Sequence, residues 1–91
     1  MPKTWELRID PDALTDLNNL ARSVRDRIWK FLSVRLVNLS DPRSVGEALK
    51  GTKFGDLWRY RVGDYRIMAR IEDQSITVVV VRIGHRKEIY R

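Results

Sequence analysis

In the first part of the chain, apolar residues occur at every second position and then recur at helical spacing. Residues 4–9 carry apolar side chains at every second position, which predicts a half-buried strand. Asp10 and Pro11 end this strand and open a helix that runs to about Ala21, because aspartate caps helix N-termini and proline suits the first helical position. Apolar residues at helical spacing over 23–39 predict a second, longer helix. The two together form a helical hairpin.

The second half of the chain predicts strands joined by short turns. Residues 40–56 hold three of the five glycines and predict a connecting loop with one short turn of helix. Strand-like runs follow at 57–62, 65–72 and 75–83, separated by the turn residues Gly63-Asp64 and Asp73-Gln74. The order predicts an α+β fold: an N-terminal strand, a helical hairpin and an antiparallel β-meander, with the helices packed on one sheet face and the other face open.

The length and the residue types exclude several classes of protein. A chain of 91 residues suffices for one small domain, which we expect to span residues 1–91. The absence of cysteine excludes disulfides, thiolate nucleophiles and sulfur-ligated zinc, and the single histidine, His85, cannot hold a metal alone, so we expect no metal or cofactor. The longest apolar run, residues 78–81, is far below the roughly 18 residues of a membrane span, and residues 1–5 lack the apolar region of a signal peptide. The expected location is the cytoplasm, with no membrane partner.

Positive charge is concentrated in the second half of the sequence. Residues 1–49 carry eight basic and seven acidic side chains, and residues 50–91 carry ten basic and five acidic ones, so the net charge of +6 divides into +1 and +5. A basic surface attracts polyanions and gains affinity from counterion release. Arginine outnumbers lysine there by seven to three, and its planar guanidinium suits phosphate. The charge therefore favours a nucleic acid partner over a merely solvated basic surface.

Part of this charge is predicted to lie on the open face of the sheet. In two neighbouring strands, arginines alternate with the apolar residues that belong in the core, and the arginines are Arg59, Arg61, Arg66 and Arg70. Like charges on neighbouring strands repel each other unless an anion or a carboxylate lies among them. The array therefore indicates an anion-binding site.

The motifs of the common cofactor-dependent enzymes do not occur in the sequence. Neither G-x-x-x-x-G-K-[ST] nor G-x-G-x-x-G is present, and no spacing of His, Asp and Glu matches a metal site. Arginine, lysine, tyrosine and one histidine remain as reactive side chains. These groups can still cleave RNA, because its 2′-hydroxyl is an internal nucleophile that needs only alignment, proton removal and charge stabilisation.

Three segments together resemble a known family. They are Leu49-Lys50-Gly51, the run LWRYRVGDYRI from Leu57 to Ile67, and the run RIGHRKEIY from Arg82 to Tyr90. With the chain length and the element order, they resemble the RelE toxins of the RelE/ParE superfamily. The resemblance implies an mRNA interferase, an endoribonuclease that enters the ribosomal A site beside 16S ribosomal RNA and cuts the codon there. It also implies a cognate antitoxin as partner, and contact with operator DNA only through the antitoxin complex.

The resemblance also implies roles for individual residues. Arg66 would hold the scissile phosphate, Arg86 would stabilise charge on the phosphorane or the leaving group, and Tyr90 would activate the 2′-hydroxyl once neighbouring arginines lower its pKa. His85 stands where some relatives have lysine, and for this residue a catalytic role and a surface role stay equally open. The expected contacts to RNA and the ribosome are seven basic residues of the second half: Lys50, Lys53, Arg59, Arg61, Arg70, Arg82 and Lys87.

Two other functions stay open. ParE-type members of the superfamily share the scaffold but inhibit DNA gyrase by binding it, and they generally lack the arginine and tyrosine set, so Arg66, Arg86 and Tyr90 favour the nuclease. A basic nucleic-acid-binding module without toxicity would need only the sheet arginines. For the nuclease, we expect the antitoxin to cover the basic sheet or to displace the C-terminal segment.

Overall fold

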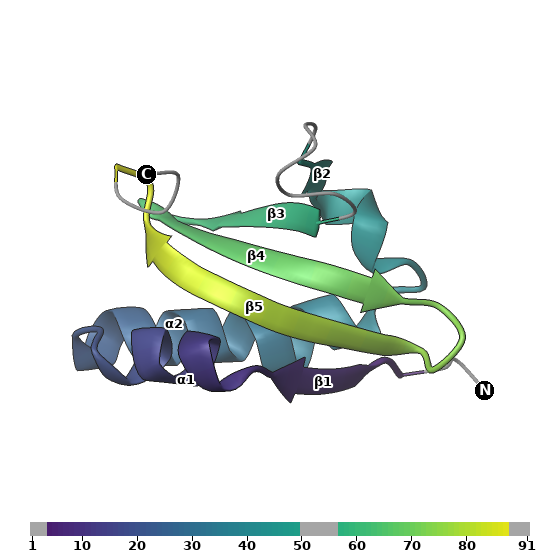
Figure 1. The fold of residues 1–91 in the computed structure, drawn as a ribbon, viewed down its shortest axis with the longest axis horizontal. Helices are drawn as coiled ribbons and strands as arrows, with labels where there is room; N and C mark the ends of the chain where they lie inside the picture. Colours follow the sequence, from purple (N-terminus) through teal and green to yellow (C-terminus); the bar gives the residue numbers. More distant parts are fainter. Residues whose placement is uncertain (1–3, 50–56, 88–91) are drawn as a thin grey trace.

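A five-stranded sheet lies on a layer of helices in the computed structural model, which describes residues 4–49 and 57–87 (Figure 1). The strands are β1 (Glu6–Ile9), β2 (Glu47–Ala48), β3 (Leu57–Val62), β4 (Tyr65–Glu72) and β5 (Thr77–His85), and their order in the sheet is β1-β5-β4-β3-β2. β1 pairs with β5 in parallel, and the other neighbours are antiparallel. The predicted α+β fold with its meander is confirmed, because β3, β4 and β5 are consecutive antiparallel neighbours.

The helical layer departs from the sequence-based prediction after its start. α1 (Pro11–Asn18) follows the extended residue Asp10 and ends before the predicted Ala21. α2 (Arg22–Lys30) continues directly into a π-helical turn, η1 (Phe31–Arg35), and a 3₁₀ turn, η2 (Leu36–Asn38). None of the helices in 4–49 and 57–87 is long and apolar enough to span a membrane.

Side-chain hydrogen bonds accompany the change of helix type after Lys30. The Ser33 hydroxyl donates to the carbonyl of Trp29 at 2.7 Å, and the Asn38 amide donates to the carbonyl of Val34. Such bonds compete with the regular backbone ladder and bend helices. The single helix predicted over residues 23–39 is therefore three consecutive helical pieces that follow one path.

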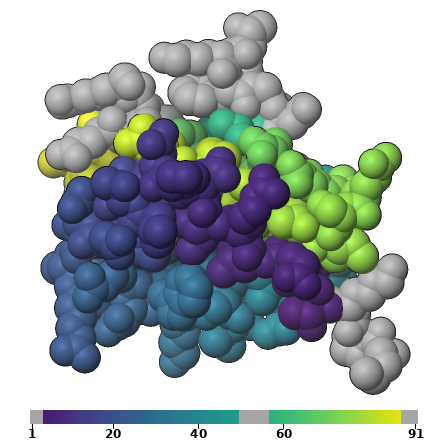
Figure 2. Space-filling view, turned by 60° about the horizontal axis from the view of Figure 1, so that its bottom comes forward, coloured from purple at the N-terminus to yellow at the C-terminus, as the bar shows by residue number. Residues whose placement is uncertain are grey.

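The core lies between the helices and one face of the sheet. Most of its fully buried members come from the helical layer (Ala13, Ile28, Leu32 and Leu36) and from β4 and β5 (Ile67, Ala69, Val78 and Val80), and Tyr60 of β3 joins them. Figure 2 shows the helix side of the molecule, where α1 and α2 form most of the surface and β4 and β5 emerge at its upper edge. The other face of the sheet is thus the one available for a site.

The segment before β3 contains a short strand that the sequence did not predict. The predicted turn of helix is present as η3 (Pro42–Val45), and β2 follows it and pairs with β3. The Tyr60 hydroxyl donates to the Pro42 carbonyl at 2.8 Å, and burial raises the pKa of Tyr60. Gly46 lies so close to the Tyr60 ring that a Cβ atom there would come within 2.7 Å of it. These contacts hold β2 at the edge of the sheet.

The two turns of the meander differ in length. Gly63-Asp64 forms the predicted two-residue turn between β3 and β4, and Gly63 takes the positive φ of 59° that such turns favour. The second turn extends to Ile76, which has a φ of 50°, and its amide donates to the carbonyl of Asp73 at 3.2 Å. β5 therefore begins at Thr77, two residues after the predicted start, and reaches His85.

Candidate nucleic-acid interface

Four arginines share the sheet face that the helices leave uncovered. In the register of β3 and β4, Arg61 lies opposite Arg66, Arg59 opposite Met68, and Leu57 opposite Arg70. The alternate residues of both strands, Tyr60, Val62, Ile67 and Ala69 among them, are buried in the core. The predicted face of Arg59, Arg61, Arg66 and Arg70 is confirmed. Met68, between Arg66 and Arg70 on this face, is buried, and of the four arginines Arg61, beside the β3–β4 turn, is exposed while the others are half-buried.

Arg66 is held over the β3–β4 turn by its own backbone surroundings. It is the second residue of β4, and its Nη1 donates to the carbonyls of Gly63 at 3.1 Å and Tyr65 at 3.0 Å. Arg61, directly across the ladder, is exposed, with 59% of its side chain accessible. Two guanidinium groups from neighbouring strands therefore flank this end of the sheet.

Arg86 reaches the same turn from the end of β5. Its backbone N–H donates to the carbonyl of Asp64 at 2.9 Å, and its Nε lies 3.9 Å from the Asp64 carboxylate. Gly84, two residues earlier, pairs directly with Arg66. We call Arg61, Arg66 and Arg86 the turn cluster, because all three adjoin the β3–β4 turn. The structure thus brings together two of the predicted catalytic residues, which lie 20 positions apart in the sequence.

Glu47 places a carboxylate beside two of the sheet arginines. Its carboxylate accepts a hydrogen bond from Arg59 and lies 3.5 Å from the Arg61 guanidinium. The hydrogen bond from Arg59 is the main cause that lowers the pKa of Glu47, with the charges of Arg59 and Arg61 acting in the same direction. Glu47 therefore stays ionised at neutral pH and occupies a position that suits a phosphate oxygen.

Replacing Glu47 by glutamine is expected to raise affinity for RNA about threefold at low salt, because one competing anion leaves the basic face. The change is measured by fluorescence anisotropy of a labelled single-stranded RNA at two salt concentrations. Glu6→Gln is the matched control, since Glu6 is exposed on β1 at the opposite edge of the sheet. Equal gains in the two variants would show that only net charge matters.

Arg70 and Arg82 lie apart from the turn cluster and each contacts a carboxylate. Arg70 Nε lies 3.1 Å from Glu72. Arg82 donates to Asp16 of α1 through Nε at 2.8 Å, a bond that raises the pKa of Arg82, and Asp16 also accepts the N–H of Ile83 at 2.9 Å. Arg82 therefore joins β5 to α1, although the strand register places it opposite Met68, on the same sheet face as Arg66 and Arg70.

His85 lies on the other side of the sheet from Arg66. It pairs with Tyr65, and their rings meet edge to face with centroids 5.5 Å apart. With Asp16 of α1 and Leu20, which follows that helix, the two rings line a cavity of about 360 Å³. The His85 Nδ1 accepts the backbone N–H of Lys87, which is exposed. The structure therefore separates the imidazole of His85 from the turn cluster.

Some predicted residues lie outside the described part of the chain. They are Lys50, Lys53 and Tyr90. Within residues 4–49 and 57–87, no group of three or more His, Asp and Glu side chains is placed to hold a metal ion. Sequence reasoning missed Glu47 and Asp16, because their partners are distant in the chain and are set by strand register and helix packing.

Comparisons with known proteins agree with this fold. The family model described as the ParE toxin of the type II toxin-antitoxin system parDE matches residues 7–90. Toxin RelG of Mycobacterium tuberculosis is 34% identical over 91 residues, which cover 100% of this chain and 99% of that protein. Two solved structures are also similar. The RelBE2 toxin-antitoxin complex of M. tuberculosis has a TM-score of 0.84 at 27% identity, covering 97% of this chain and 98% of that one. The intact Escherichia coli RelBE complex has a TM-score of 0.72 at 25% identity, covering 89% and 95%.

The chain belongs to the RelE/ParE superfamily of toxins from type II toxin-antitoxin systems. Within this superfamily it is a RelE-family toxin, as the three sequence segments predicted.

Proposed function

We propose that this toxin is a metal-independent endoribonuclease that cuts messenger RNA at the A-site codon of the ribosome and so inhibits translation. The turn cluster is the observation that carries the proposal, because Arg61, Arg66 and Arg86 converge on one exposed end of the sheet. A phosphate bound there contacts guanidinium groups from β3, from β4 and from the residue that directly follows β5. Similarity to RelE-family toxins supports the same activity.

The proposed reaction needs only groups that RNA and the toxin provide. The 2′-hydroxyl loses its proton to a base, its oxygen bonds to the adjacent phosphorus, and the bond from phosphorus to the 5′-oxygen breaks as that oxygen takes up a proton. Arg66 holds the scissile phosphate, and Arg86 stabilises the negative charge of the phosphorane and the leaving oxygen. Tyr90 is the proposed base, a role carried over from the family resemblance to a residue outside the described part of the chain.

The proposed binding partners of the toxin are inferred from the proteins to which it is similar. Solved structures similar to this chain include toxin-antitoxin complexes from M. tuberculosis, E. coli and Pyrococcus horikoshii. We infer that a cognate antitoxin binds this chain in the cytoplasm, and that operator DNA is reached only through the antitoxin complex. Arg59, Arg70, Lys50, Lys53 and Lys87 are proposed contacts to mRNA and 16S ribosomal RNA.

The test is primer extension on a defined message bound to ribosomes with an empty A site. Purified toxin is expected to give a new end within the A-site codon, and none in a control without ribosomes. Cleavage of free RNA at many sites would contradict ribosome dependence. No cleavage under either condition would contradict the nuclease.

The alternative function is inhibition of DNA gyrase. The family model that matches this chain describes ParE toxins, which favours this candidate over any other non-nuclease. A supercoiling assay with purified gyrase separates the two functions, because a toxin that cuts only ribosome-bound mRNA leaves gyrase activity unchanged.

His85→Gln is expected to retain cleavage within about threefold of the wild type, because the imidazole faces α1 while the turn cluster lies on the open sheet face. The measurement is the single-turnover rate of codon cleavage on ribosomes. A loss of tenfold or more with unchanged ribosome affinity would instead support the predicted role of His85 in proton transfer.

A further inference from the structure

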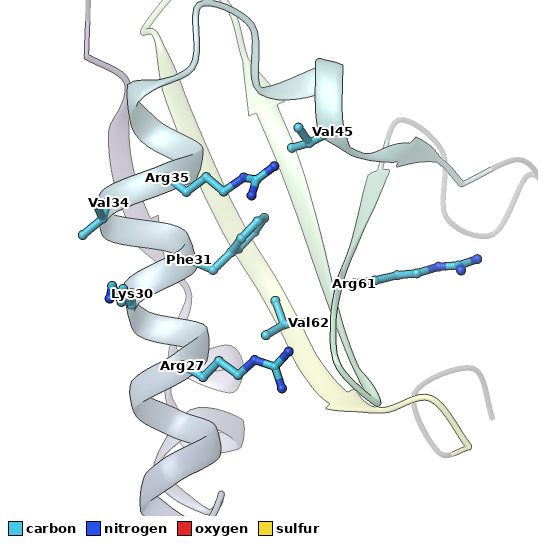
Figure 3. A pocket seen from close by; sticks show the side chains of 8 residues that line it. All are labelled: Arg27, Lys30, Phe31, Val34, Arg35, Val45, Arg61 and Val62. Atoms are coloured by element: carbon cyan, nitrogen blue, oxygen red, sulfur yellow. The ribbon is translucent and has the colours of Figure 1, made fainter.

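Two arginines of the turn cluster reach the open face of the sheet by the regular alternation of their strands. In β3, Val62 points toward the helical layer and Arg61 points away from it (Figure 3). In β4, Ile67 is buried in the core, and its neighbour Arg66 lies on the open face opposite Arg61. Arg86, the third member of the cluster, follows a strand that does not alternate regularly.

This strand, β5, contains a β-bulge at Val81. Val80 pairs with Ala69, but the next pair of the ladder joins Arg82 to Met68, so Val81 is an extra residue in β5. One extra residue exchanges the faces of all side chains that follow it, because side chains along a strand point to opposite faces in turn. The alternation of β5 therefore reverses at the bulge.

The reversal brings the end of β5 to the turn cluster. Val80 is fully buried in the core, and regular alternation would direct Arg82 and Gly84 to the same side. The bulge instead places Gly84 on the open face, where it pairs with Arg66, and it buries Ile83 in the core. The position of the third arginine of the turn cluster, two residues after Gly84, therefore depends on this bulge.

Asp16 of α1 binds both residues that follow the bulge. Its Oδ2 atom accepts the backbone N–H of Ile83 at 2.9 Å and the Nε–H of Arg82 at 2.8 Å, and its Oδ1 atom accepts from Arg82 Nη2 at 3.2 Å. The Asp16 side chain is only 17% accessible. A carboxylate that accepts two bonds from one guanidinium has a defined geometry as well as strength. α1 therefore fixes the direction of β5 immediately after the bulge.

The same carboxylate occupies the place that a neighbouring strand would take. β1 pairs with β5 only as far as Val80, whose carbonyl accepts the N–H of Asp10 at 2.9 Å. Beyond Val80, no strand of the described residues lies along this edge of β5, and Asp16 accepts the Ile83 N–H there. The last part of β5 is thus anchored on this side by one side chain and not by a β-ladder.

We propose that Asp16 is a positioning residue of the nuclease, which fixes the bulged end of β5 so that Arg86 lies beside Arg66. This role rests on the proposed function, and it assigns Arg82 to the contact with Asp16 and not to RNA. The Arg86 side chain is 54% accessible and lies 3.9 Å from the Asp64 carboxylate, an exposed contact that adds little. The place of Arg86 is therefore determined by its backbone, which continues directly from β5.

The first test measures single-turnover cleavage and ribosome affinity separately. Asp16→Asn is expected to slow codon cleavage about fivefold and Asp16→Ala about 20-fold, both with ribosome affinity within about twofold of the wild type. The asparagine keeps an oxygen for the Ile83 N–H but loses the charge that pairs with Arg82. Asp26→Asn is the matched control, because it removes the same charge from an exposed ion pair with Arg22 on α2. Its cleavage rate is expected to equal that of the wild type.

The second test is hydrogen exchange followed by NMR, which needs no cleavage. In both Asp16 variants, the amides of Gly84 and Arg86 are expected to exchange at least about tenfold faster, because their pairing with β4 and with the Asp64 carbonyl depends on the fixed end of β5. The amides of residues 77–80, which lie between β1 and β4, are expected to stay within about twofold. Equal acceleration in both groups would indicate general destabilisation and would overturn the proposal.

The outcomes separate this proposal from the nuclease activity itself. Faster exchange confined to Gly84 and Arg86 supports the placement of Arg86 by Asp16, even if the wild-type toxin cuts no message. Unchanged exchange at these two amides overturns the proposal, even if the Asp16 variants cut slowly. Tighter ribosome binding with a wild-type cleavage rate in Asp16→Ala also overturns it, and assigns the released guanidinium of Arg82 to RNA.

Discussion

Arg66→Ala is expected to slow codon cleavage on ribosomes about 100-fold, the cost typical of removing one group that stabilises transition-state charge. Arg66 is fixed before substrate binds, because its guanidinium is hydrogen-bonded to the carbonyls of Gly63 and Tyr65. It therefore needs little rearrangement to meet a phosphate. The measurement is the single-turnover rate with toxin in excess over ribosomes, so that binding does not limit the reaction.

The controls for Arg66→Ala distinguish loss of charge from loss of structure. Arg66→Lys keeps the charge but loses the two-pronged geometry, and an intermediate rate is expected. Arg22→Ala removes an arginine at the start of α2 whose side chain is 87% accessible, and the wild-type rate is expected. A wild-type rate in Arg66→Ala itself would remove this residue from the proposed chemistry.

Leu32→Ala is expected to lower the free energy of unfolding by about 3 kcal/mol, through lost burial and the cavity left behind. Leu32 lies in η1, is fully buried, and packs in the core between helices and sheet. A domain of this size is stable by about 5 to 14 kcal/mol, so the loss is a large fraction of the total. Urea unfolding followed by circular dichroism measures it, provided that the slope of the transition is unchanged.

Val34→Ala is the matched control for Leu32→Ala. Val34 lies in the same π-helical turn but is 55% accessible, so the expected loss is below about 0.5 kcal/mol. Similar losses in the two variants would contradict the burial that the structure gives to this turn.

The sequence predicted the parts of the fold that local patterns determine. The alternation in residues 57–62 and 65–72 and the Gly63-Asp64 turn placed β3 and β4 at their observed bounds. The change of helix type after Lys30 was missed. It involves side-chain hydrogen bonds, such as that from the Ser33 hydroxyl to the Trp29 carbonyl, and the spacing of apolar residues does not indicate such bonds. β2 was missed because a strand of two residues is too short to show a pattern, and because the close approach of Gly46 to the Tyr60 ring just before it joins residues distant in the sequence.

The candidate site was also predicted from the sequence only in part. Strand alternation placed the sheet arginines on one face, and the hairpin turn brought Arg61 opposite Arg66. The sheet side of His85 depended on the register of β5, and the contact of Arg82 with Asp16 depended on the position of α1. The run predicted as the last strand, residues 75–83, is apolar except at Ser75, Thr77 and Arg82, and such a run does not reveal which side chains face the helices.

The position of β5 in the sheet also bears on how the toxin is made. β5 is the last of the described strands to leave the ribosome, yet it lies between β1 and β4 and is the only described strand that pairs with β1. A nascent chain that ends before Thr77 therefore has a helical layer and a hairpin but no joined sheet. Gly84 and Arg86 must both be synthesised before the open face is complete beside Arg66. The order of synthesis thus delays the assembly of this surface until after the rest of the domain has emerged.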